Sequence, residues 1–171
     1  MIRRLLAALV VSALPLFGPG CGGGAAQMPP SMQSPIAGKP LPDFKRRTLE
    51  GAEVDTKGLR GRVVVVKFFA KYCEPCKRTL PAVQALSKDR QDITFIGIAE
   101  DEREVDVREM IGAYGLTFPV IHDRGNVLSG RYRVSEMPVT FVVDAQGTIR
   151  WVGGPEQSEV ELEQAILAVA P

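Results

Sequence analysis

The chain of 171 residues carries 21 Lys and Arg against 20 Asp and Glu, and 45% of its residues are hydrophobic. This composition suits one globular domain that buries its own core, and it excludes a disordered chain. The net charge of +1 argues against nucleic acid as a partner, because a nucleic-acid-binding surface calls for a strong basic excess. Three cysteines are an odd number, so at least one has no partner within the chain.

The N-terminal segment has the pattern of an export signal. Arg3 and Arg4 precede an apolar run at 5–17, and small residues follow it, which indicates a secretory signal peptide over residues 1–20. The run is too short for a membrane-spanning helix, which needs about 20 residues. Cys21 comes next, and its placement resembles a bacterial lipoprotein signal, in which that cysteine becomes the lipidated N-terminus.

A tether and a single domain are predicted after this signal. Residues 21–40 are rich in Gly and Pro and cannot form regular structure, so we expect them to link a lipid anchor to a domain at 41–171. Within that domain, buried or apolar runs predict strands at 63–69, 93–98, 118–121, 139–143 and 148–152, the last two joined as a hairpin. Helical spacing predicts helices at 75–89, 107–114, 127–132 and 160–169. This order predicts one α/β sandwich with helices on both faces of a mixed central sheet.

A pair of cysteines separated by two residues lies where the first strand turns into the first helix. At the helix N-terminus, unpaired amides and the helix dipole stabilise a thiolate, so Cys73 is the candidate nucleophile. Cys76 lies one turn further and is placed to resolve a mixed disulfide. Pro75 fits the first helical turn.

Two other interpretations of the pair are weaker. A structural disulfide over so small a loop would restrict the unfolded chain very little. A zinc site would need further ligands, and the single histidine, His122, lies far away in sequence. A lone histidine is more often structural than catalytic. Redox chemistry at Cys73 and Cys76 is therefore the favoured prediction.

These features resemble the thioredoxin superfamily and, more narrowly, the exported TlpA/ResA/CcmG group of thiol-disulfide oxidoreductases. The resemblance rests on the stretch 68–77, on Pro81 and on the stretch 137–147, and it covers about residues 38–170. It implies a thioredoxin-like fold in which Pro138 is cis and lies against the cysteine pair, where its ring blocks metal from the dithiol. It implies no cofactor beyond the redox-active Cys73–Cys76 disulfide.

The resemblance also suggests which residues meet the substrate. The backbone of Met137 would pair with the substrate chain, and Tyr72, Glu74 and Pro75 would border it beside the cysteines.

The chain departs from the wider superfamily in places. Phe69 and Tyr72 stand where Trp is common, which keeps the apolar cover but changes its shape. Lys67 stands where cytoplasmic thioredoxins carry a buried Asp that handles the proton of the resolving cysteine. That role cannot be transferred to a lysine.

The exported group instead uses an acid near the end of the second strand, where this chain has Glu100, Asp101 and Glu102. An ungapped match favours Glu102, with Glu100 as the alternative, and such an acid could accept a proton from Cys76. The same three residues would equally suit the solvated start of the following helix.

The direction of electron flow is predicted to be reducing. Glu74 puts a negative charge beside Cys73, which disfavours the thiolate and favours the disulfide, and this makes the pair a better reductant. The resemblance implies disulfide-containing envelope proteins such as apocytochromes c as clients, an electron donor in the membrane, and a monomer on the outer side of a bacterial membrane.

Two other functions compete with this prediction. The stretch 138–147 also resembles the peroxiredoxins. These proteins carry a Thr or Ser three residues before their peroxidatic cysteine, whereas this chain has Ala70 three residues before Cys73. The Sco group of copper carriers uses a cysteine pair with three intervening residues and a histidine, whereas this pair has two and His122 is poorly placed.

Overall fold

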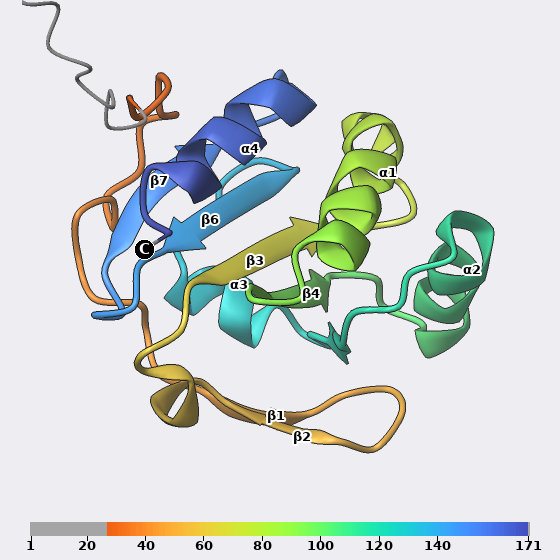
Figure 1. Cartoon of the computed structure of the whole chain (residues 1–171). Coiled ribbons are helices and arrows are strands. Elements are labelled where there is room, and N and C mark those ends of the chain that lie inside the picture. The colour runs from red at the N-terminus through yellow and green to blue at the C-terminus, as the bar shows by residue number, and fades with distance from the viewer. Residues whose placement is uncertain (1–26, 171) are drawn as a thin grey trace, which may run out of the picture.

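The computed structural model describes residues 27–170, so the predicted signal peptide and Cys21 lie outside the described part. Five strands form a central mixed sheet in the order β5-β4-β3-β6-β7, and two short strands pair separately (Figure 1). The α/β fold predicted from the sequence is confirmed. The elements in chain order are β1 (Lys45–Arg47), β2 (Glu53–Asp55), the 3-10 helix η1 (Thr56–Leu59), β3 (Val64–Phe69), α1 (Glu74–Asp89), β4 (Thr94–Ala99), α2 (Glu104–Tyr114), β5 (Val120–His122), α3 (Val127–Arg131), β6 (Val139–Val143), β7 (Ile149–Gly153) and α4 (Glu159–Leu167).

Strand β3 lies at the centre of the sheet, and all six of its residues are buried. It runs parallel to β4 and antiparallel to β6. A strand with both faces covered needs apolar residues at nearly every position, which explains its run of β-branched and aromatic side chains. Its last residue, Phe69, comes four positions before Cys73, so the cysteine pair lies at the carboxyl end of the central strand.

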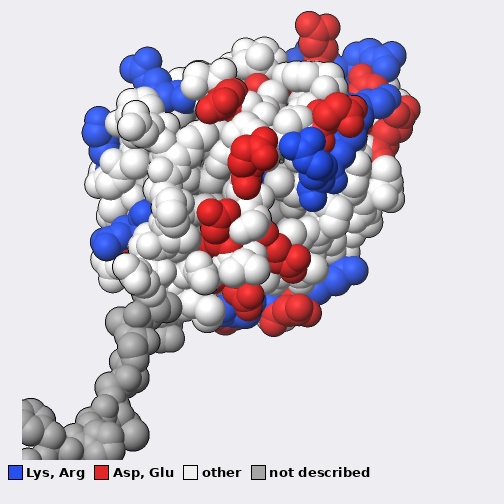
Figure 2. Space-filling view, turned by 90° about the horizontal axis from the view of Figure 1, so that it is seen from above, with Lys and Arg blue, Asp and Glu red and all other residues white. Residues whose placement is uncertain are grey.

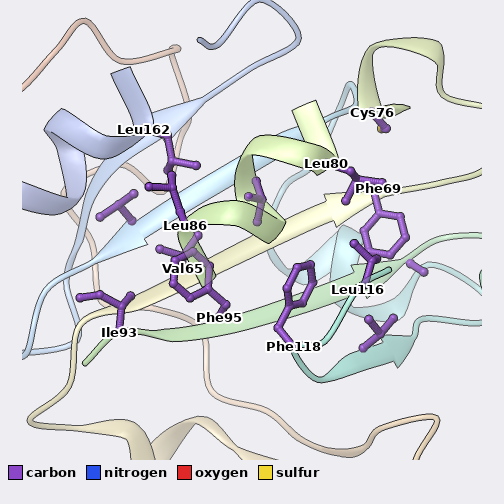
Figure 3. Close-up of a cluster of buried hydrophobic side chains, with 14 of the residues drawn as sticks. Val65, Phe69, Cys76, Leu80, Leu86, Ile93, Phe95, Leu116, Phe118 and Leu162 are labelled. Carbon is purple, nitrogen blue, oxygen red and sulfur yellow. The ribbon is translucent and has the colours of Figure 1, made fainter. Parts of the chain in front are cut away.

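The larger core cluster lies between the sheet and helices α1, α2 and α4. Figure 3 shows Leu80 and Leu86 of α1 and Leu162 of α4 above Val65 and Phe69 of β3. Each of these side chains is at most 7% exposed, and burying one such side chain contributes about 1.5–3 kcal/mol. This packing fixes α1, and with it the cysteine pair at its N-terminus.

The opposite face of the sheet is covered by α3 and by the chain that precedes β3. Its centre is an aromatic group formed by Phe44, Phe68, Tyr132 and Phe141, with ring centroids 5.2–6.2 Å apart. The Tyr132 hydroxyl donates a hydrogen bond to the Pro42 carbonyl at 2.9 Å. The β1-β2 pair and η1 in this region were not predicted, because the strands are three residues each and largely exposed.

The segment 27–40 differs from the predicted tether, since it is packed along the edge strand β7. The Met32 amide donates to the Val152 carbonyl at 2.7 Å, and the Trp151 indole donates to the Pro30 carbonyl at 2.7 Å. Met28 packs against the larger core cluster. The packed domain therefore includes residues 28–40, which were predicted as tether, and the segment covers an edge that would otherwise expose unpaired backbone groups.

The surface carries charges of both signs. Figure 2 shows acidic side chains spread over the middle of the face seen from above Figure 1, with Lys and Arg mostly nearer its margins. None of the helices within residues 27–170 has the length and apolar character needed to cross a bilayer.

Candidate active site

Cys73 and Cys76 form a disulfide at the N-terminus of α1, with an S–S distance of 2.02 Å. Cys73 is the N-cap residue, and its Sγ accepts a hydrogen bond from the Cys76 amide at 3.1 Å. Pro75 lies in the first turn, where a missing amide costs no intrahelical bond. Cys73 lines a surface groove, whereas Cys76 is fully buried. An incoming sulfur therefore meets Cys73, and the helix terminus stabilises its thiolate after reduction.

A groove of about 510 Å³ opens beside Cys73. The Met137–Pro138 peptide bond is cis, and it directly precedes β6. Met137 lines the groove and packs partly against the larger core cluster, while Pro138 is buried. The groove is lined by Tyr72, Cys73, Glu74, Pro75, Glu100, Val134, Ser135, Glu136 and Met137. The structure thus brings together the cysteine nucleophile and all four residues expected to border the substrate.

Of the three candidate acids at 100–102, Glu100 is the one that lines this groove. It directly follows β4, it is partly buried, and its Oε1 has no hydrogen-bond partner among residues 27–170. Burial raises the pKa of the Glu100 carboxyl, and the nearby carboxylates of Asp123 and Asp101 raise it further. A carboxyl with a raised pKa that lines the same groove as Cys73 is suited to exchange protons with the cysteine pair.

The two neighbouring acids are placed differently. Asp101 is buried, and its carboxylate accepts hydrogen bonds from the Lys71 amide at 3.0 and 3.2 Å. Glu102 is exposed and lines a second hollow of about 680 Å³, which it shares with Glu100 and Asp101 but not with Cys73. The ungapped match that favoured Glu102 therefore selected a residue outside the groove of Cys73.

Two side chains flank Cys73 on the surface. Tyr72 is 67% exposed, and its pKa is raised by partial burial and by the charges of Glu100 and Asp101. Glu74 is paired with Lys77 one turn along α1, and both side chains reach solvent. This ion pair offsets the negative charge that Glu74 was expected to place beside Cys73.

His122 takes no part in the groove. Its Nε2 lies 2.6 Å from the Asp101 carbonyl oxygen, which ties the end of β5 to the loop after β4. Within residues 27–170, no group of three or more His, Cys, Asp or Glu side chains is arranged to hold a metal ion.

Residues 134–136 line the groove but were not singled out in the sequence. Their only signal was their position directly before the Met137–Pro138 bond. Two of them, Ser135 and Glu136, are exposed and offer polar contacts to a bound chain.

Known proteins with sequences similar to this chain are thiol-disulfide oxidoreductases and thioredoxin-like proteins. The sequence profile of the AhpC/TSA family matches residues 37–152. The thiol-disulfide oxidoreductase ResA of Bacillus anthracis is 30% identical over 136 residues, which cover 78% of this chain and 79% of ResA. The thioredoxin-like protein YneN of Bacillus subtilis is 29% identical over 135 residues, which cover 75% of this chain and 78% of YneN.

Solved structures show the same fold. A secreted disulfide oxidoreductase of Mycobacterium tuberculosis, homologous to Escherichia coli DsbE, is 28% identical and matches with a TM-score of 0.68 over 73% of this chain and 95% of its own. A thiol:disulfide interchange protein DsbE from Chlorobium tepidum matches with a TM-score of 0.72 at 24% identity, over 78% of this chain and 96% of its own.

A disulfide at the first turn of α1, beside a cis proline on a thioredoxin-like sheet, defines a thiol-disulfide oxidoreductase. The chain belongs to the AhpC/TSA family and, within it, to the thioredoxin-like proteins of the TlpA/ResA/CcmG type.

Proposed function

We propose that this thiol-disulfide oxidoreductase is exported and reduces disulfides of client proteins in the bacterial envelope, such as apocytochromes c. The observation that carries the proposal is the opening of Cys73 into the same groove as Glu100 and Met137. An extended client segment that lies in this groove would meet the sulfur, a proton-exchanging carboxyl and the backbone before the cis proline together.

The reaction follows from the two sulfur environments. In the reduced protein, the Cys73 thiolate attacks one sulfur of the client disulfide, and the other client sulfur leaves as a thiolate that takes a proton from solvent. Cys76 then loses its proton, with Glu100 as the acceptor, and its thiolate attacks Cys73 Sγ. The second client thiolate leaves, so the client gains two electrons and the Cys73–Cys76 disulfide is regenerated. Disulfide exchange of this kind needs no bound cofactor.

The reducing direction is favoured by the charge of Glu100 rather than by Glu74. A carboxylate beside the pair disfavours a thiolate on either cysteine, which stabilises the disulfide and lowers the reduction potential. Glu74 contributes less because its charge is paired with Lys77. Electrons would reach the disulfide from a donor in the membrane, and the protein would act as a monomer.

Export and anchoring rest on the sequence and on one relative. The signal-like residues 1–20 and Cys21 support a lipid anchor, and the M. tuberculosis protein similar to this chain is described as secreted. Since Met28 already packs against the core, at most six residues separate a lipidated Cys21 from the packed domain. Labelling of cells with a radioactive fatty acid tests this, with Cys21→Ser as the control; equal labelling of both proteins contradicts the anchor.

Client capture tests the main proposal. The Cys76→Ala variant should accumulate a mixed disulfide with its clients through Cys73, and Cys73→Ser should abolish both capture and turnover. Full turnover by either variant would contradict the dithiol mechanism.

The potential of the pair, measured by equilibrium with glutathione, tests the direction. Strong periplasmic oxidants have a reduction potential of about −120 mV. We expect the potential of this pair to lie well below that value, and a potential as high as theirs would refute the reductant role. Stopped-flow oxidation with hydrogen peroxide tests the peroxidase alternative, which predicts rapid oxidation of Cys73.

A further inference from the structure

Lys67 is a fully buried lysine in the central strand. Its neighbours on the strand, Val65 and Phe69, belong to the larger core cluster, on the side of the sheet that α1 covers. Because side chains alternate along a strand, Lys67 points to that same side. Figure 3 shows Leu80 and Cys76 of α1 above this part of β3. The amine therefore lies in the layer between the sheet and the helix that carries the buried sulfur.

The amine has one hydrogen-bond partner within residues 27–170. Nζ donates to Thr140 Oγ1 at 3.0 Å, and Thr140 is the residue opposite Lys67 in the β3-β6 pairing. Thr140 itself comes two residues after Pro138, which directly precedes β6. Lys67 is thus held against the strand that follows the cis peptide bond.

Lys67 lacks a counter-charge in the described structure. The other buried charged side chains are Asp101, Asp123 and Asp144. Each accepts hydrogen bonds from backbone amides, those of α3 in the case of Asp123, rather than from Lys67. On the other elements of this layer, β4 presents Gly97 opposite Lys67, and Glu159, Glu161 and Glu163 of α4 are not buried.

The charged side chains of α1 are likewise unburied, and the buried ionisable group that α1 presents to this layer is the sulfur of Cys76. An unpaired buried charge is costly. Burial alone lowers the pKa of Lys67 to about 7. The amine can therefore change its charge near neutral pH.

We propose that Lys67 is a positioning residue for the redox couple: its buried amine gains a proton when the Cys73–Cys76 disulfide is reduced, and its positive charge stabilises the thiolate of the reduced pair. The inference rests on the dithiol chemistry of the proposed function, and it holds for electron flow in either direction. No contact between Nζ and sulfur is required, because charge interactions act over several ångströms in a poorly solvated interior.

Reduction of the disulfide by a thiol pair of a donor or of glutathione breaks the Cys73–Cys76 bond and transfers two electrons. One accompanying proton binds Cys76, and the second binds Lys67 Nζ while Cys73 stays a thiolate. On reoxidation both protons return to solvent. Lys67 therefore favours the reduced form and raises the potential, against the influence of Glu100.

The test is the equilibrium of the full chain with glutathione at pH 7. Lys67→Met should shift it about tenfold towards the disulfide, which is about 30 mV for a two-electron couple. Lys67→Gln keeps a donor for Thr140 without a charge and should shift it equally. Val65→Ala, a cavity on the same face of the same strand, should stay within twofold. The shift should shrink towards pH 10, where the amine is neutral in the wild type as well.

Three results would overturn the inference. The first is glutathione equilibrium constants of Lys67→Met and wild type that agree within twofold at pH 7. The others are a shift that does not depend on pH and an equal shift in Val65→Ala. A shift in Lys67→Met with none in Lys67→Gln would also overturn it, because the hydrogen bond rather than the charge would then matter. A wild-type potential as high as that of strong oxidants refutes the reductant role instead and leaves the Lys67 comparison intact.

Discussion

Replacing Lys67 by Met should stabilise the oxidised protein, and by more at low pH than at high pH. Burial lowers the pKa of Lys67 from 10.5 to about 7. At about 1.4 kcal/mol per pKa unit, this corresponds to about 5 kcal/mol of unfavourable free energy for the charged amine in the folded state. Loss of the hydrogen bond to Thr140 offsets about 1 kcal/mol. We therefore expect Lys67→Met to raise the free energy of unfolding by about 4 kcal/mol at pH 6.

The pH dependence has a definite sign. Below pH 7 both the folded and the unfolded states carry the proton, and the folded state bears the whole cost. Between pH 7 and pH 10.5 the unfolded chain keeps a proton that the folded protein has released, so the wild type gains stability as the pH rises. The advantage of Lys67→Met should fall by about 3 kcal/mol between pH 6 and pH 9.5.

Urea unfolding of both oxidised proteins, followed by far-ultraviolet circular dichroism at pH 6 and pH 9.5, measures this difference directly. A gain in stability that is equal at the two pH values would show that Lys67 carries no buried charge at pH 6. A loss of stability at pH 6 would show that the amine has stabilising partners, and either result refutes the reasoning.

Three further substitutions test other parts of the molecule. Glu100→Gln should slow reduction of a disulfide-containing peptide about 10²-fold and flatten its rate profile between pH 4 and pH 8, and an unchanged profile would remove Glu100 from proton transfer. Ser158→Ala removes the capping box of α4 and should cost about 1 kcal/mol in urea unfolding; a value near zero would make that box redundant. Gly97→Ala should cost about 1–3 kcal/mol, because its Cβ would lie 3.0 Å from the Phe118 ring, whereas Gly112→Ala, which meets nothing within 4 Å, should not destabilise.

The fold was predictable where the sequence pattern is strong. The buried strands β3 and β6 and the helix α1 appear close to their predicted bounds, because their apolar residues repeat with the period of the element. The same holds for the position of Cys73 at the helix start, since a strand run that ends just before a cysteine pair leaves few other arrangements. The local sequence pattern was therefore sufficient to predict the structure of these segments.

Features that depend on distant contacts could not be predicted. Composition alone predicted a tether at 21–40, yet carbonyls and amides within residues 30–39 bond to the edge strand β7, over 100 residues away. The choice among the three acids also needed the tertiary structure. Glu100 and Glu102 differ by two positions in sequence, and only the path of the chain after β4 turns one towards Cys73 and the other towards solvent.

Two ionisable side chains near the disulfide, the partly buried Glu100 and the buried Lys67, lie on opposite faces of the sheet. Glu100 follows β4 on the same face of the sheet as Ile98, the face that α3 covers. The charge of Asp123, which lies just before α3, raises the pKa of the Glu100 carboxyl. Lys67 lies on the face that α1 covers. A carboxylate disfavours the thiolates and an ammonium favours them, so the two groups act in opposite directions on one potential. The cysteine pair and the helix dipole are common to oxidants and reductants of this fold. The balance between these two charges is therefore the part of the site that we expect to set the reduction potential of the cysteine pair.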